Sequence, residues 1–66
     1  MDREVIFNQL REEFDAKRVS KQTATKAMNI YNAEVSKEER ITGCLCTVAK
    51  RKIVSKMMLE WYEAIH

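Results

Sequence analysis

The chain has 66 residues, so it forms one domain at most, and a chain of this length buries only about 60% of its unfolded surface. It contains no proline and a single glycine, Gly43, which excludes a turn-rich β fold, while residues that favour helices are abundant. The net charge is a modest +2, and no apolar run approaches the length of a membrane span. These features predict one all-α domain over residues 1–66 that does not enter a membrane.

Apolar side chains at helical spacing predict a first helix over residues 3–17, with Asp2 as its N-cap. Ser20 is the next capping residue and opens a second helix over residues 21–34. Ser36 and Glu39 match a capping box, so a short extra turn is expected after this helix. The apolar stripes are Ile6, Phe7, Leu10 and Phe14 in the first helix, and Ala24, Ala27, Met28, Tyr31 and Val35 in the second.

The last third of the chain predicts the longest helix, over residues 43–64, which is apolar on more than one side. Its main stripe, expected in the core, consists of Cys46, Ala49, Ile53, Val54, Met57, Trp61 and Ala64, with Met58 and Ile65 at the margin. A second apolar patch consists of Cys44, Val48, Leu59 and Tyr62. Two short helices cover the first stripe only, so the second patch is predicted to be a protein interface.

The Cys44-x-Cys46 pair raises the question of a disulfide or a zinc site. On a helix the two side chains diverge by about 200°, which disfavours a disulfide. Structural zinc takes four ligands, and the chain offers only these cysteines and His66. We therefore expect buried free cysteines, no metal and no cofactor. Together with the start Met1-Asp2-Arg3-Glu4, which lacks a signal-peptide pattern, this predicts a cytoplasmic protein.

Charge is distributed unevenly along the chain. Residues 17–56 carry ten basic and three acidic residues, whereas residues 1–16 carry two basic and five acidic ones. The basic residues of the third helix are Lys50, Arg51, Lys52 and Lys56. Such a stripe is suited to phosphate groups or to an acidic protein surface, and is also typical of a solvated helix face. The acids are adjacent rather than facing, and no phosphate-binding loop is present, so no enzyme activity and no small-molecule substrate are expected.

Residues 10–29 resemble the helix-turn-helix of bacterial repressors. The matching residues are Val19, Ser20, Thr23, Thr25, Lys26, Met28 and Asn29. The chain departs from that pattern at two places, since Arg18 stands where the turn glycine is usual and Phe14 replaces a small residue. The resemblance implies a DNA-binding surface in the major groove, made by Lys21, Gln22, Thr23 and Lys26.

A second pattern covers the C-terminal two thirds of the chain. It consists of Tyr31-Asn32, a polar loop with Thr42, Cys44 and Cys46, then Arg51, and finally Trp61-Tyr62-Glu63. This pattern is similar to small helical proteins of tailed phages that infect Bacteroidetes, which often have two residues between the cysteines where this chain has one. The resemblance implies a protein that joins or decorates virion components, or one that binds and inhibits a host protein.

We therefore expect a non-catalytic three-helix protein that docks on itself or on a larger protein through its C-terminal helix. The leading version is a virion component, in the host cytoplasm or the virion. Val48, Leu59 and Tyr62 would be buried against the partner, with the basic residues of the third helix at the rim. The alternative is a small DNA-binding regulator that uses residues 17–29.

Overall fold

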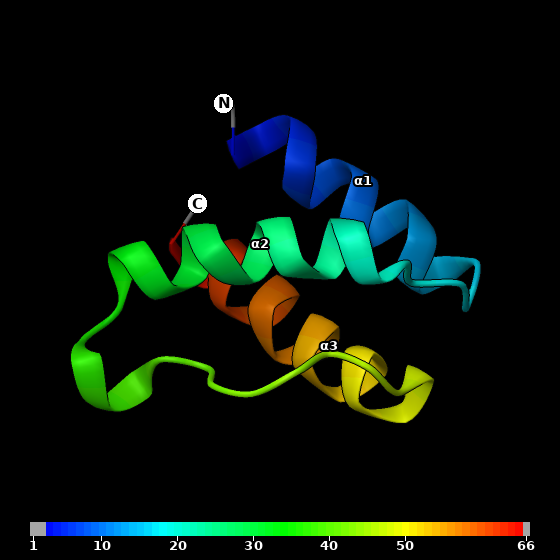
Figure 1. The fold of residues 1–66 in the computed structure, drawn as a ribbon. Helices are drawn as coiled ribbons and strands as arrows, with labels where there is room; N and C mark the ends of the chain where they lie inside the picture. Colours follow the sequence, from blue (N-terminus) through cyan, green and yellow to red (C-terminus); the bar gives the residue numbers. More distant parts are fainter. Residues whose placement is uncertain (1–2, 66) are drawn as a thin grey trace.

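The computed structural model describes residues 3–65, and it confirms an all-α fold of three helices (Figure 1). Helix α1 spans Arg3–Asp15, α2 spans Lys21–Glu34 and α3 spans Val48–Ile65, with a 3-10 turn η1 at Lys37–Glu39. Each helix packs against the other two. Helices α2 and α3 begin at the same end of the molecule, and α1 runs back toward that end above them.

The core consists of apolar side chains from all three helices and from two connecting segments. Its buried members are Ile6, Phe7, Leu10, Val19, Ala24, Ala27, Tyr31, Leu45, Val54, Met58 and Leu59. The stripes predicted for the first two helices are confirmed, because Phe14, Met28 and Val35 pack against this core as partly buried residues. Aromatic rings join the helices: Phe7 stacks on Tyr62 with centroids 4.4 Å apart, and Tyr31 meets Trp61 edge-on at 4.9 Å.

Helix α1 ends at Asp15, two residues earlier than predicted, because the chain turns through a left-handed residue. Lys17 has a φ of 60°, so Lys17 is the left-handed residue of this turn. The helix-turn-helix resemblance had placed the turn position one residue later, at Arg18. The N–H of Arg18 donates to the carbonyl of Glu13 and that of Lys17 to the carbonyl of Phe14, at 2.9 and 3.0 Å. This pair of bonds is the Schellman motif, which satisfies carbonyls left open at the end of a helix.

Two side chains, those of Ser20 and Glu13, form hydrogen bonds at the start of α2. The hydroxyl of Ser20 accepts the N–H of Thr23 at 3.2 Å, which confirms Ser20 as the N-cap. The carboxylate of Glu13, at the end of α1, accepts the N–H of Ser20 at 2.8 Å and the hydroxyl of Thr23 at 2.7 Å. One acidic side chain therefore links the last turn of α1 to the first turn of α2.

This network predicts a pH-dependent contribution from Glu13. Desolvation raises the pKa of Glu13, but hydrogen bonds from Ser20, Gln9 and Thr23 outweigh it and lower the pKa below its ordinary 4.5. The stabilisation is then complete above the unfolded pKa and is lost as pH falls through the lower, folded pKa. Melting curves of the native protein and Glu13→Gln should differ at neutral pH and converge as the pH falls below 4.5 and through the lower, folded pKa. The exposed neighbour variant Glu12→Gln should show no such convergence.

The third helix starts at Val48, five residues later than predicted. Thr47 caps this start, since its hydroxyl accepts the N–H of Lys50 at 3.2 Å. Gly43 has a φ of 97° and interrupts any helix there. Residues 40–47 instead form an irregular connection that runs beside α2 and α3 (Figure 1).

The side chain of Asn32 attaches this connection to α2. Its amide donates to the carbonyl of Ile41 at 3.0 Å and accepts the N–H of Ile41 at 2.8 Å. Arg40 donates to the carbonyl of Asn32 at 3.1 Å. The short turn expected after α2 is present as η1, but the side chain of Ser36 makes no capping bond. The connection is thus anchored by Asn32 and not by the predicted capping box.

Ser55 is the one buried polar residue of the core in the described chain. It is fully buried, and its hydroxyl has no hydrogen-bond partner among residues 3–65. Burying an unpaired hydroxyl is unfavourable, and alanine has the higher helix propensity. We expect Ser55→Ala to raise the free energy of unfolding by about 1 kcal/mol in urea denaturation. Ser36→Ala is the matched control, and a destabilised Ser55→Ala would show that the hydroxyl has a partner.

Candidate functional site

The side of α3 that faces solvent carries apolar side chains. Ile53 is 71% exposed and Met57 is 41% exposed, one helical turn apart. Ala49 and Ala64 are also exposed and continue the same row. We call these four residues the outer face of α3. Large apolar side chains that recur on one exposed helix side form a surface suited to protein contacts.

The structure changes the predicted orientation of this helix, although Val54 and Trp61 of the predicted stripe do lie in or against the core. Leu59 and Tyr62, predicted as interface residues, lie against the core: Leu59 is buried, and Tyr62 is partly buried on Phe7. Ile53 and Met57, predicted as core residues, are exposed. Of the other predicted interface residues, Val48 is exposed in the first turn of α3 and Cys44 is exposed in the preceding connection.

The position of Lys50 gives a physical reason for this orientation. At about 100° per residue, Lys50 projects within the predicted stripe, between Met57 and Trp61, so burying that stripe would also bury its ammonium group. The opposite side of the helix offers Val54, Met58 and Leu59, with the small Ser55 and the partly buried Arg51 among them. Burial of that side leaves Lys50 in water.

The charged residues beside the outer face are separated by sign along the helix. Lys50, Lys52 and Lys56 are exposed in its first half. Glu60 and Glu63 are exposed in its second half, where Glu63 also forms an ion pair with Arg11 of α1. The outer face therefore has a basic and an acidic half.

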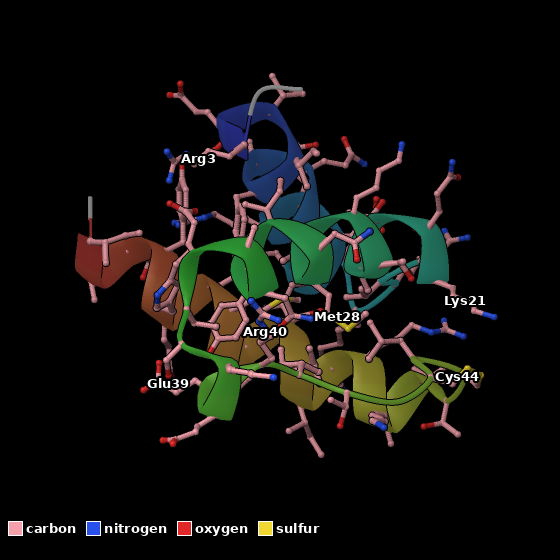
Figure 2. All side chains as sticks on the ribbon, turned by 60° about the vertical axis from the view of Figure 1, so that its left-hand side comes forward. Arg3, Lys21, Met28, Glu39, Arg40 and Cys44 are labelled. Atoms are coloured by element: carbon pink, nitrogen blue, oxygen red, sulfur yellow. A yellow bond between two sulfur atoms is a disulfide. The ribbon has the colours of Figure 1, made fainter. Side chains whose placement is uncertain are left out.

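The residues of α2 predicted to contact nucleic acid do not all reach solvent. Lys21, Gln22 and Lys26 are exposed on α2, and Lys21 lies at the same end of the molecule as Cys44 (Figure 2). Thr23 is partly buried and its hydroxyl donates to Glu13. The structure thus keeps three of the four candidates of α2 on the surface and uses the fourth in the helix cap.

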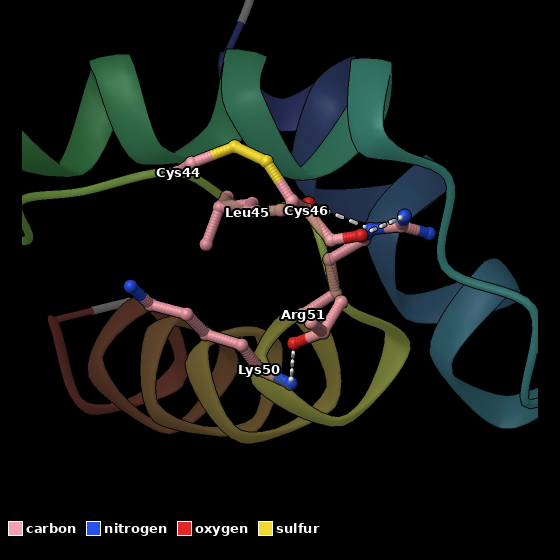
Figure 3. The surroundings of a disulfide bond; sticks show 6 residues. Cys44, Leu45, Cys46, Lys50 and Arg51 are labelled. Carbon is pink, nitrogen blue, oxygen red and sulfur yellow. Dashed lines mark hydrogen bonds between the residues drawn. A yellow bond between two sulfur atoms is a disulfide. The ribbon is translucent and has the colours of Figure 1, made fainter.

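Arg51 has a structural role that the sequence did not indicate. Its guanidinium donates to the carbonyls of Leu45 and Cys46 at 2.8 and 3.1 Å (Figure 3). It also donates to the carbonyl of Val19 at 3.1 Å. These bonds connect α3 to the residues before it and to the turn between α1 and α2. These three bonds hold the guanidinium against the backbone, which makes Arg51 a structural residue rather than a free charge for the predicted phosphate or rim contact. A single arginine in a basic run gives no sequence signal for such a role.

Cys44 and Cys46 form a disulfide, with Cα atoms 5.3 Å apart (Figure 3). The prediction of buried, unpaired cysteines is wrong because it assumed a helix through both residues. The segment is not helical, and Leu45 is buried between two exposed cysteines, as in an extended chain whose alternate side chains share a side. The prediction of a cytoplasmic protein therefore loses the support that it drew from free cysteines.

Residues 3–65 contain no group of three or more His, Cys, Asp or Glu side chains placed to hold a metal ion. His66, considered as a ligand in the sequence, and Asp2, considered as a cap, lie outside the described residues. No helix in the described part of the chain is long and apolar enough to span a membrane. A shallow groove between α1 and α3 is lined by Arg11, Phe14, Lys56, Leu59, Glu60 and Glu63.

No family model, characterised protein or solved structure matches the chain. The resemblances to phage proteins and to repressors therefore stay predictions from the sequence.

Proposed function

We propose that this protein is a non-catalytic binding module that pairs with a second copy of itself through the outer face of α3. The observation that supports this most directly is the exposure of Ile53, 71%, beside the exposed Met57 on the longest helix. Leaving such side chains in water is unfavourable, and covering them with a second helix removes apolar surface from solvent. The predicted docking helix is retained in this proposal, with a different side of it as the contact.

The order of charges favours an antiparallel pair. A two-fold axis beside Met57 would place the basic half of each α3, with Lys50 and Lys56, against the acidic half of the other, with Glu60 and Glu63. A parallel pair would bring like charges together. Such an arrangement is isologous and closes as a dimer.

The size of the surface sets the expected affinity. One face of a single helix buries less than about 1,200 Å² in total, which is the range of weak and transient interfaces. We therefore expect a dissociation constant in the micromolar range, so that monomers and dimers exchange with concentration.

Sedimentation velocity over a range of concentrations tests this proposal. The native protein should shift from monomer to dimer, and Ile53→Glu should stay monomeric, because it places two carboxylates in the contact. Val5→Glu is the matched control: Val5 is an exposed apolar residue of α1, outside the proposed surface. A native protein that stays monomeric at millimolar concentration would overturn self-association and make a larger protein the occupant to seek.

A charge exchange tests the antiparallel arrangement separately. Lys56→Glu should weaken the dimer at low salt, and the double variant Lys56→Glu with Glu60→Lys should restore it, since both halves are then exchanged together. Failure of the double variant to recover would contradict the antiparallel pairing even if Ile53→Glu dissociates the dimer.

We propose a virion component as the setting for this module, in line with the resemblance to small tailed-phage proteins. Virions are built from repeated copies, and a weak self-complementary contact suits a protein that becomes ordered on a repeated surface. The protein would then occur in the host cytoplasm during assembly and in the mature particle. Inhibition of a host protein through the same surface is the competing version.

DNA binding is a second candidate function, supported by the exposure of Lys21, Gln22 and Lys26 on α2. If α2 contacts phosphates, Lys21→Ala and Lys26→Ala should each weaken binding to a random-sequence duplex and lower the salt dependence by about one phosphate contact. Melting temperatures should stay nearly unchanged. Fluorescence anisotropy at two salt concentrations measures this, with Lys37→Ala in η1 as the control. Equal affinity in all variants would remove this candidate.

A further inference from the structure

The Cys44–Cys46 disulfide stabilises the fold little by its connectivity. It joins residues that are two positions apart, so it closes the smallest of loops and restricts few conformations of the unfolded chain. The same segment is already fixed by other means. Leu45 between the cysteines is 2% exposed in the core, and Arg51 holds the carbonyls of Leu45 and Cys46. The backbone around the disulfide is therefore anchored independently of the S–S bond.

Both cysteines are exposed, so a thiolate in solution can approach either sulfur. The surroundings are positively charged. Lys50 extends toward the segment, since a Cβ added at Gly43 would lie 2.9 Å from its Nζ atom. Helix α3 begins two residues after Cys46. A thiolate released at Cys44, next to Gly43, can be stabilised by the ammonium group of Lys50, as nearby cations do at the reactive cysteines of other proteins.

From this combination we propose that Cys44 and Cys46 are a redox-active pair that exchanges with dithiols of small molecules or proteins. Anchoring of the backbone by Leu45 and Arg51 lets the S–S bond open and close while the helices stay in place. The exposed sulfurs supply the reaction site, and Lys50 assists the leaving thiolate. This site is separate from the outer face of α3, apart from Lys50, which borders both.

The reaction is a two-step exchange. A substrate thiolate attacks one sulfur of the Cys44–Cys46 bond, which forms a mixed disulfide and releases the other cysteine as a thiolate. The second substrate thiolate then attacks the substrate sulfur of the mixed disulfide and releases the second cysteine. The substrate dithiol becomes a disulfide and gives up two electrons and two protons, and the cysteine pair becomes a dithiol that takes them up.

Reduction of the oxidised protein by dithiothreitol tests the proposal. Alkylation of new thiols followed by mass spectrometry gives the rate. We expect reduction to be at least about tenfold faster than that of oxidised glutathione at the same pH, because the leaving thiolate is stabilised. Lys50→Met should slow the reaction by about threefold. Lys56→Met, which removes another exposed charge of α3, should not change the rate.

Further measurements separate a redox site from a structural bond. The helical circular dichroism should be unchanged after reduction. Cys44→Ser treated with oxidised glutathione should form a mixed disulfide at Cys46. Ile53→Glu should react as fast as the native protein, so dimerisation and reactivity can fail independently. A rate no faster than that of oxidised glutathione, or loss of helix on reduction, would overturn the proposal.

Discussion

Replacement of Phe7 by alanine is expected to leave little folded protein at room temperature. Phe7 is 1% exposed, stacks on Tyr62 and has its ring centroid 6.1 Å from that of Trp61, so it joins α1 to α3. Truncation of a buried phenylalanine costs about 3–5 kcal/mol, and small single domains have few kcal/mol in total. Circular dichroism and urea denaturation should show a largely unfolded chain.

Val5→Ala is the control for Phe7→Ala, since Val5 belongs to the same helix but is exposed. It should unfold at nearly the native urea concentration. Phe7→Leu should fall between the two, because it keeps most of the buried apolar volume but loses the ring stacking. A Phe7→Ala protein with native stability would mean that the stacking on Tyr62 does not hold α3 in place.

Arg51→Met should lower the free energy of unfolding by about 3 kcal/mol, because three carbonyls lose a charged donor while the aliphatic part of the side chain is retained. This estimate allows for the partial exposure of Arg51, which lets water replace some of the lost bonds. Urea denaturation measures the change. Amide hydrogen exchange should also be faster at Leu45 and Cys46, which report the freed connection.

Lys52→Met is the matched control for Arg51→Met, since the neighbouring Lys52 is exposed and has no hydrogen bond of this kind. It should change stability by less than about 0.5 kcal/mol. Arg51→Lys tests geometry: one ammonium cannot reach three carbonyls on two segments as the planar guanidinium does, so it should be destabilised nearly as much as Arg51→Met. Equal stability of the Arg51 and Lys52 variants would contradict the structural role of Arg51.

The first two helices could be predicted because each has a single apolar stripe and a local start signal. The capping residue Ser20, followed by apolar residues along one side of the helix, predicted the bounds of α2 that the structure shows. The end of α1 was placed two residues late because Lys17 adopts a left-handed backbone that its residue type does not indicate. Only a glycine or an asparagine at that position would have given a signal.

The third helix could be predicted to exist, but neither its start nor its orientation followed from the sequence. Residues 43–47 contain no helix-breaking proline, and the bonds that hold them outside the helix come from Arg51, later in the chain. The orientation was missed because α3 is apolar on two sides. Lys50 and Glu60, which both project within the apolar stripe, were local signs that this side faces solvent. The disulfide was missed because the predicted helix included Cys44 and Cys46, and a helix would have kept their side chains apart.

The position of Trp61 makes the packing of α3 directly visible by fluorescence. Trp61 is the single tryptophan of the chain, it is partly buried, and it lies between Tyr31 of α2 and Phe7 of α1. Its emission thus depends on the contact of α3 with both other helices, whereas circular dichroism depends on helix content in all three. If the two signals change together on denaturation, the bundle unfolds in one cooperative step, and if emission changes first, α3 detaches from an intact pair of helices.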